Sequence, residues 1–308
     1  MANMDLLKKL RENTGCGMSD CNKALNECAD NYDEAVQWLR KKGLSTAAKK
    51  SSRVATEGVV GILNNGNVAS ILEVNAETDF VARNEKFQDF VRKCLNECLS
   101  IEESDEAKFV ETLKGKTSGS NTIAEALVEN IAVIGENLQI RRGKTFKQNK
   151  GLITSYVHSS IVDGLGKIGV LVNLESEATK DELTELGEQL AMQIAASKPE
   201  FLDETSIPAD KLEVEKEIAK TKAKEQKKPD NIIEKIVDGA IKKYIEENTL
   251  LNQVFIMDET KKVKDLLADF EKKSGKSVKV VEYVLYVLGE GIEKEVVDFA
   301  DEVNSMIK

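Results

Sequence analysis

Few residues in this chain of 308 could carry out covalent chemistry. His158 is the only histidine, so it is the only available anchor for a hydrolase triad, and sites built from several histidines are excluded. It ends an expected strand, where a lone histidine more often makes a structural or interface hydrogen bond. Paired carboxylates are plentiful, but none has a recognisable catalytic context. The sequence nominates no catalytic centre.

Three Gly-Lys-Thr or Gly-Lys-Ser triplets could belong to phosphate-binding loops. A P-loop also needs a glycine five residues before the triplet, so that backbone N–H groups can surround the phosphates. Another residue type occupies that position in all three cases. No Gly-x-Gly-x-x-Gly opens a helix after a strand either. We therefore expect no nucleotide-binding element and no cofactor. The triplets begin at Gly115, Gly143 and Gly275.

The five cysteines are typical of a reduced, intracellular protein, because their number is odd and their density is far below that of a disulfide scaffold. Cys94 and Cys98 lie one helical turn apart and could present two thiols to a metal ion. No histidine lies nearby, so two buried structural thiols are the favoured interpretation. We expect no metal site.

Composition and charge limit the classes of partner that the protein can bind. The chain is 41% hydrophobic and carries 44 basic against 54 acidic side chains, a formal net charge of −10. Such a molecule repels phosphate backbones as a whole, which argues against a nucleic-acid partner. No run approaches the 18 apolar residues of a membrane span, and the first residues contain no apolar leader segment. We expect a cytoplasmic protein without a membrane partner.

The most distinctive segment is residues 73–90, EVNAETDFVARNEKFQDF. An expected strand delivers Thr78, Asp79, Phe80 and Val81 to its end, and the chain must turn there before a helix begins near residue 84. A carboxylate and a large ring are therefore adjacent at a corner. From the residues alone, Phe80 is more often a core residue than a binding residue. Both interpretations stay open at this point.

The elements before this segment form a small helical unit. Apolar residues recur at helical spacing through residues 4–44 and predict three short helices. Ser19 is a candidate N-cap for the second helix, and Asn31 with Glu34 resembles a capping box for the third. The segment 40–53 has six basic residues and no acidic one. We interpret it as a helix end followed by a solvated tether.

The elements after residue 54 form a repeat. A strand, a turn, a second strand and a helix occur twice, and each set regains a further strand later, which predicts two related α+β subdomains with small antiparallel sheets. Asn-Gly in the first turn supports a hairpin there. The first set comprises residues 59–63, 68–74, 85–99 and 138–146, and the second 152–157, 168–174, 181–196 and 278–288.

An insertion interrupts the second set. All three prolines, Pro199, Pro208 and Pro229, bracket a charged segment with few large apolar residues, which predicts a helical hairpin that projects from the body or meets a partner. A short amphipathic helix is expected over residues 293–306. The predicted domains are 1–54, 55–147, 148–288 with the insertion at about 198–230, and 289–308.

Several motifs in collinear order resemble the bacterial elongation factor Ts family over essentially the whole chain. The turn at residues 158–167 is longer than the family's and departs from its pattern. The motifs are TGCGMSDCNKAL at 14–25, AAKK at 47–50, EVNAETDFVA at 73–82, IGVLV at 168–172, AASKPEF at 195–201 and VLGEGIEK at 287–294.

The resemblance implies a non-enzymatic nucleotide exchange factor for the GTPase elongation factor Tu in its GDP-bound form. It implies that the first three helices form a domain like the ubiquitin-associated type, that the hairpin can form a homodimer, and that the C-terminal helix is a contact module. It assigns displacement of the partner's Mg²⁺ to Thr78, Asp79, Phe80, Val81 and Ala82. His158 would lie near a further partner contact.

Two other functions remain open from the sequence. The N-terminal helices alone could belong to a scaffold that binds ubiquitin-like folds. An enzyme using Asp79 or His158 is the second alternative. Loss of nucleotide exchange on Phe80→Ala, with the fold intact, would argue against both.

Overall fold

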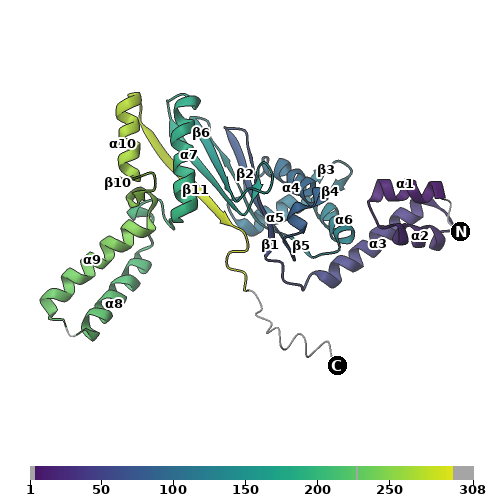
Figure 1. Ribbon diagram of the computed structural model, residues 1–308, viewed down its shortest axis with the longest axis horizontal. Helices are drawn as coiled ribbons and strands as arrows, with labels where there is room; N and C mark the ends of the chain where they lie inside the picture. Colours follow the sequence, from purple (N-terminus) through teal and green to yellow (C-terminus); the bar gives the residue numbers. More distant parts are fainter. Residues whose placement is uncertain (1–3, 227, 294–308) are drawn as a thin grey trace.

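The computed structural model describes residues 4–226 and 228–293 and confirms an α+β fold. The described chain is extended, with the N-terminal helices at one end, two sheets in the middle and a long helical hairpin at the other (Figure 1). The helices are α1 (Met4–Thr14), α2 (Met18–Glu27), α3 (Tyr32–Lys50), η1 (Val81–Arg83), α4 (Glu85–Cys98), α5 (Glu106–Gly115), α6 (Ile123–Ile134), α7 (Lys180–Ser197), η2 (Glu204–Ser206), α8 (Ala209–Glu225), α9 (Asp230–Asn248), η3 (Leu250–Asn252) and α10 (Val263–Ser274). The strands are β1 (Glu57–Asn64), β2 (Val68–Ala76), β3 (Thr117–Ser118), β4 (Asn121–Thr122), β5 (Leu138–Lys147), β6 (Gly151–His158), β7 (Leu165–Gly166), β8 (Ile168–Ser176), β9 (Val254–Phe255), β10 (Asp258–Lys262) and β11 (Val278–Val287).

Helices α1 to α3 pack around a small apolar core of their own, as predicted. Asn31 caps α3, because its side-chain oxygen accepts a hydrogen bond from the Glu34 backbone N–H at 3.3 Å. The predicted cap of α2 is wrong: Gly17 holds that position, and Ser19 lies inside the helix. The likeness of this unit to a ubiquitin-associated domain stays a prediction.

The expected tether after α3 is instead helical as far as Lys50. Lysine, arginine and alanine favour helix, so the segment needs only a surface to dock on. Helix α6 provides it: Arg40 forms an ion pair of 3.0 Å with Glu125, and Ala47 packs against the main core. The expected solvated tether is therefore wrong in this part, since Gly43 is buried and Arg40 and Lys50 are half-buried.

The first sheet has the strand order β5-β2-β1-β7, with antiparallel pairing throughout. Helices α4, α5 and α6 cover one of its faces, and their apolar side chains form the largest buried cluster. The predicted hairpin is confirmed, since β1 and β2 pair in register across a turn at residues 65–67. In the second repeat, Leu165 and Gly166, between the two expected strands, form the short strand β7.

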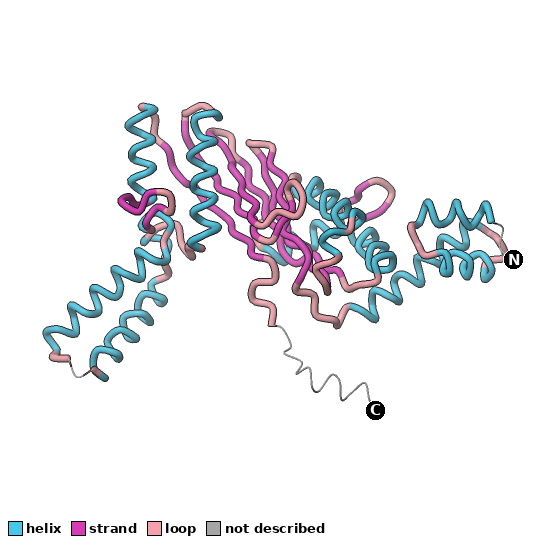
Figure 2. The backbone as a smooth tube through the Cα atoms, in the orientation of Figure 1, coloured by secondary structure: helices cyan, strands magenta, loops and turns pink. Residues whose placement is uncertain are grey.

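The second sheet has the order β11-β8-β6, and α7 and α10 cover its outer face. The inner faces of the two sheets pack on each other through a third cluster that includes Ile71, Phe146, Ile153 and Leu171. The body of the molecule is therefore built of four layers, with helices outside and sheets inside, which can be followed in Figure 2.

The predicted duplication is confirmed by the matching strand order of β5-β2-β1 and β11-β8-β6. Gly58 in β1 and Gly151 in β6 hold equivalent places and share one constraint. A Cβ atom would lie 2.2 Å from the Val74 carbonyl oxygen at the first glycine and 2.0 Å from the Leu174 carbonyl oxygen at the second. Only glycine allows this close approach of neighbouring strands.

The inserted helical hairpin is longer than predicted. Its arms are α8 and α9, so the hairpin ends at Asn248, well beyond the expected limit near residue 230. Pro208 and Pro229 each stand at the N-cap, directly before the first residue of a helix. Proline is compatible with a helix start because no intrahelical bond is lost there. Pro229 thus begins the second arm, where the prediction placed an end.

The predicted C-terminal helix over residues 293–306 lies outside the described residues apart from residue 293. The domain boundaries stay predictions. No helix in residues 4–226 or 228–293 is both long enough and apolar enough to cross a membrane.

Candidate functional site

The candidate site is a short loop between β2 and α4. Residues 77–80, here named the tip loop, follow the end of β2 and lead into η1 and then α4. Asn84 caps α4, because its side-chain oxygen accepts hydrogen bonds from the N–H groups of Lys86 at 2.9 Å and Phe87 at 3.4 Å. The end of a strand and the start of a capped helix therefore fix both ends of the loop.

Phe80 is the most exposed large apolar side chain of the described residues, at 79%. The interpretation of Phe80 as a core residue is therefore wrong. Asp79 beside it is also exposed. Val81 and Ala82, in contrast, are buried in the main core under α4. The tip loop presents one ring and one carboxylate to water, and the next two residues anchor it.

Glu136 holds the N-terminal side of the tip loop. Its carboxylate accepts two hydrogen bonds from Thr78, one from the backbone N–H at 2.9 Å and one from the hydroxyl at 2.7 Å. Glu136 directly follows Gly135, the left-handed C-cap of α6 with a φ of +85°. That glycine turns the chain back toward the end of β2.

A second set of bonds lies beside the first. The N–H of Asn137 donates to a Glu77 carboxylate oxygen at 2.6 Å, and the side-chain amide of Asn137 donates to the Arg53 carbonyl at 2.7 Å. The Arg53 guanidinium also contacts the Glu77 carboxylate at 3.5 Å. The bonds between residues 77–78 and 136–137 are here named the clasp.

The C-terminal side of the tip loop is fixed by a buried glutamine. The Gln88 side-chain amide donates to the Ala82 carbonyl at 2.9 Å. The turn of η1 adds a backbone bond of 3.1 Å from the Arg83 N–H to the Phe80 carbonyl. Asp79 and Phe80 are therefore the exposed part of a segment held on both sides.

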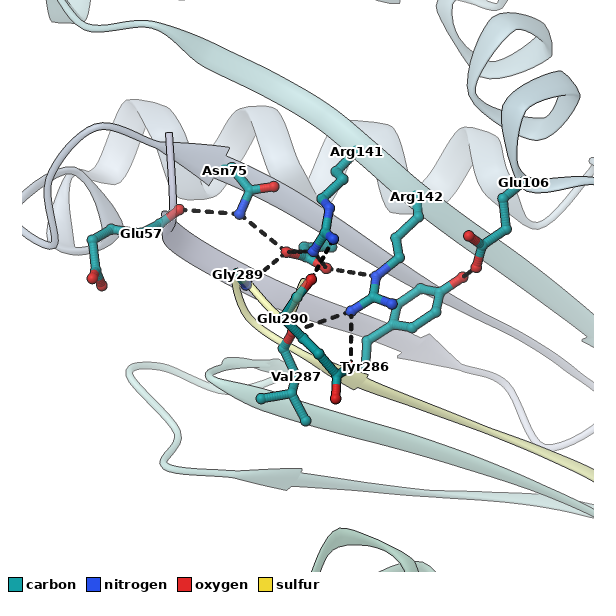
Figure 3. A network of polar contacts seen from close by, with 10 residues as sticks. Glu57, Asn75, Glu106, Arg141, Arg142, Tyr286, Val287, Gly289 and Glu290 are labelled. Atoms are coloured by element: carbon teal, nitrogen blue, oxygen red, sulfur yellow. Dashed lines mark hydrogen bonds and ion pairs between the residues drawn. The ribbon is translucent and has the colours of Figure 1, made fainter. Parts of the chain in front are cut away.

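A buried ionic network supports the strand that carries the tip loop. Glu73 in β2 is fully buried between the sheets, and its carboxylate pairs with Arg141 at 2.9 Å and with Arg142 at 2.7 Å. The backbone N–H of Gly289 donates to the same carboxylate at 2.8 Å. Figure 3 shows the two arginines and Gly289 converging on this point, and Glu290 joined to the two arginines. The network ties β2 to the segment that leaves β11.

Electrostatics favours the charged form of Glu73. Burial opposes ionisation of this carboxyl group, but the Gly289 N–H and the guanidinium groups of Arg141 and Arg142 outweigh it and lower its pKa below the ordinary value. Arg142 also lies over the Tyr286 ring, 4.3 Å from its centroid. Burial and a hydrogen bond to Glu106 raise the pKa of Tyr286, which keeps its hydroxyl protonated.

His158 lies elsewhere, at the exposed end of β6. Its Nδ1 is 3.0 Å from the Tyr156 hydroxyl, and the two rings tilt by 37°. Among the described residues, no hydrogen bond, ion pair or ring contact joins His158 to residues 78–82. His158 and the tip loop are two separate features, on different sheets.

The cysteine pair in α4 is buried, as expected. Cys94 and Cys98 are inaccessible to solvent, and desolvation raises the pKa of both thiols. The thiolate form that binds metals is therefore disfavoured. In the described part of the chain, no group of three or more histidine, cysteine or acidic side chains is arranged to hold a metal ion.

Sequence reasoning found the exposed corner but missed its supports. Glu73 and Asn75 were detectable as two polar residues on one face of an otherwise apolar strand. Glu136 and Asn137 carry only a weak signal, since they follow a helix-ending glycine in a connection where polar residues are ordinary. Their role depends on which loop lies opposite them.

Comparison with known proteins gives one family by two routes. A family described as "Elongation factor TS" matches residues 77–290. The chain is 48% identical over 303 residues to the "Elongation factor Ts" of Erythrobacter litoralis, which covers 98% of this chain and 97% of the relative. It is 46% identical over 299 residues to that of Rhodopseudomonas palustris, covering 97% and 96%. For a Bradyrhizobium species the identity is 46% over 305 residues, covering 98% of each chain.

These matches place the chain among the translation elongation factors, the proteins that serve the growth of a polypeptide. The matched range begins at Glu77 and contains the whole tip loop together with Glu136 and Asn137. The chain belongs to the elongation factor Ts family.

Proposed function

We propose that this protein is a guanine nucleotide exchange factor for elongation factor Tu and promotes release of GDP during polypeptide elongation. Membership of the elongation factor Ts family supports this proposal, and the cytoplasm is the compartment where such a factor works. The observation that carries it is Phe80, a large ring held in water beside a carboxylate. The free energy falls when a partner covers an exposed apolar side chain of this size.

The tip loop would act on the partner's Mg²⁺. GDP in a GTPase is held by backbone N–H groups and by Mg²⁺, a hard cation that requires near-octahedral oxygen ligands. Small displacements of those ligands weaken the site sharply. Phe80 would enter the GTPase as an apolar wedge and shift the groups that hold the ion. Asp79 would compete for the ion's ligands or repel the phosphates. No covalent bond is made or broken.

The free energy needed to displace the nucleotide is more than one residue can supply. If the factor weakens nucleotide affinity by a given ratio, nucleotide weakens binding of the factor by the same ratio, and each tenfold corresponds to about 1.4 kcal/mol. Burial of one phenylalanine contributes roughly 2–3 kcal/mol. A coupling of many decades therefore needs a broad interface. We assign the further contacts to the N-terminal helices, to the second subdomain near His158 and to the C-terminal residues.

The five residues assigned to Mg²⁺ displacement divide into two roles in this proposal. Asp79 and Phe80 touch the partner, because they are the exposed ones. Thr78, Val81 and Ala82 hold them in place, because the first is bonded to Glu136 and the other two are buried.

A homodimer through the hairpin stays a further proposal. Val214, Ile218 and Ile232 are exposed apolar side chains on α8 and α9. A second copy of the chain could cover them. Sedimentation equilibrium over a range of concentrations tests this, and a monomer throughout would contradict it.

The direct test is release of a fluorescent GDP analogue from elongation factor Tu at fixed Mg²⁺. The wild-type protein should accelerate release. Phe80→Ala should lose most of the acceleration, at least tenfold, while its unfolding free energy stays within about 0.5 kcal/mol of wild type because the ring is exposed. Met257→Ala, which removes another exposed apolar side chain far from the tip loop, serves as the matched control and should behave as wild type.

The outcomes separate the alternatives. Acceleration that survives Phe80→Ala would keep the exchange function and move the mechanism to the wider interface. No acceleration by the wild type would contradict the proposed function, and a scaffold that binds without exchange would then be the better interpretation. Turnover of a substrate that depends on Asp79 or His158 would favour an enzyme.

A further inference from the structure

We infer that Glu136 is a positioning residue of the exchange reaction, which sets the fraction of molecules that present Asp79 and Phe80 in the competent arrangement. This inference rests on the proposed function and extends it to a residue outside the tip loop. Its basis is the clasp between residues 77–78 and 136–137.

The clasp begins where backbone pairing stops. The last paired residues of β2 and β5 are Ala76 and Leu138. Beyond them, the two chains are joined by side chains instead: the Thr78 N–H donates to Glu136, and the Asn137 N–H donates to Glu77. The two carboxylates therefore continue the connection between the strands for two more residues, after which the loop is free to project.

Glu136 satisfies both donors of Thr78 with one carboxylate. The two bonds, of 2.9 and 2.7 Å, use different oxygens of Glu136. Bonds to an ionised acceptor are stronger than neutral ones, and a two-point attachment fixes orientation as well as distance. Thr78 is thereby held in one rotamer, two residues before the exposed ring.

The segment that follows α3 also contacts the clasp. The Arg53 carbonyl accepts from Asn137, the Arg53 guanidinium contacts Glu77, and the Lys50 ammonium contacts the Gly135 carbonyl. The end of α3, the tip loop and the loop before β5 therefore meet at one junction. A change in the clasp reaches the tip loop from a residue that touches no partner in the proposed mechanism.

Exposure of Phe80 explains why a clasp is needed. A free loop would lower its free energy by laying the ring against the molecule's own surface. Ring burial of that kind removes the competent arrangement, and the apparent affinity or rate then falls in proportion to the competent fraction. Glu136 opposes this collapse by fixing the residues before the ring.

The test compares four variants in the same GDP-release assay, at saturating concentrations of the factor. Glu136→Ala removes both bonds to Thr78 and should lower the maximal acceleration about tenfold, which corresponds to about 1.4 kcal/mol. Thr78→Val removes only the hydroxyl bond and should lose less. Glu136→Gln keeps one acceptor oxygen and should recover part of the activity. Glu188→Ala, the same change at an exposed position on α7, should behave as wild type.

A double-mutant cycle distinguishes positioning from a general structural effect. If Glu136 acts only through Asp79 and Phe80, adding Glu136→Ala to a variant that already carries Asp79→Ala and Phe80→Ala should cause no further loss. Independent losses that multiply would overturn the inference. Urea unfolding of each variant checks that the fold is intact.

Amide hydrogen exchange at Thr78 measures whether the clasp is formed in the absence of the partner. Its N–H should be protected in the wild type and lose protection in Glu136→Ala. If the wild type does not accelerate GDP release, the proposed function fails and this inference fails with it. If the wild type accelerates release, Phe80→Ala is impaired and Glu136→Ala is not, only the inference about Glu136 is overturned.

Discussion

At the scale of single residues, Glu73 and Phe80 reverse the usual distribution of polar and apolar side chains. A carboxylate is fully buried between two sheets, and a phenylalanine is 79% exposed, although both lie on the same short stretch of chain. The buried charge has two arginines and a backbone N–H as partners. Among the described residues, none covers the exposed ring. The first residue holds the strand, and the second is available for contact.

Replacement of Glu73 by glutamine should destabilise the protein strongly. The variant leaves Arg141 and Arg142 without their anion in a largely buried place, and loss of one partner from such a pair typically costs about 3 kcal/mol. Urea unfolding at pH 7 measures this difference. Lys147→Ala removes a partner from the exposed pair with Glu102 and is the control, with an expected change below about 1 kcal/mol.

The effect of Glu73→Gln should depend on pH in one direction. The folded protein lowers the pKa of Glu73 below its ordinary value of 4.5. The stabilisation is therefore complete above pH 4.5 and is lost as the pH falls through the folded pKa. The stability difference between wild type and variant should be constant near neutral pH and shrink in acid. A difference that grew in acid would contradict this assignment.

At the scale of elements, two glycines inside helices should respond oppositely to alanine. At Gly43 in α3, a Cβ atom would lie 3.5 Å from the Ala132 Cβ, an ordinary contact, so Gly43→Ala should stabilise by about 0.5–1 kcal/mol. At Gly187 in α7, it would lie 2.3 Å from the Thr154 side chain in β6, so α7 must move. Gly187→Ala should destabilise by roughly 1–3 kcal/mol. Thermal unfolding of both variants measures the two signs.

The elements show how far the sequence could lead. Periodicity and turn residues predicted both hairpin strands, the repeated unit and the capped helix α3, because local chemistry decides those features. The helix over residues 40–50 and the exposure of Phe80 depend on what lies opposite in space. The sequence does not predict the end of the long hairpin, because proline is favoured before a helix as well as after one and Pro229 alone does not distinguish the two.

At the scale of the whole molecule, α3 is a rigid connection between the N-terminal helices and the body. It runs without interruption to Lys50 and is fixed on α6 by the pair of Arg40 and Glu125. In Figure 1 the other two N-terminal helices stand apart from the sheets. Besides α3, a hydrogen bond of 3.4 Å from the Lys86 ammonium in α4 to the Gly15 carbonyl holds them at a set distance from the body. A partner touching both regions would meet a preset spacing.

Breaking α3 should release that spacing. Ser45→Pro removes an intrahelical hydrogen bond and introduces a clash with the preceding turn, at about 3 kcal/mol. We expect small-angle X-ray scattering to report a broader distribution of distances than in the wild type, and exchange activity to fall while the sheets stay folded. Ser45→Ala is the control. Scattering curves that coincide for the two variants would show that the connection is not set by this helix.

The short strand β7 affects how the chain can be made. Leu165 and Gly166 belong to the second repeat, yet they pair with Val60 and Gly61 at the outer edge of the first sheet. A chain emerging from the ribosome folds its N-terminal part first. The outer edge of β1 in the first sheet therefore stays unpaired until the loop after β6, which contains β7, has been synthesised. A nascent chain halted before residue 165 would expose a strand edge open to aggregation.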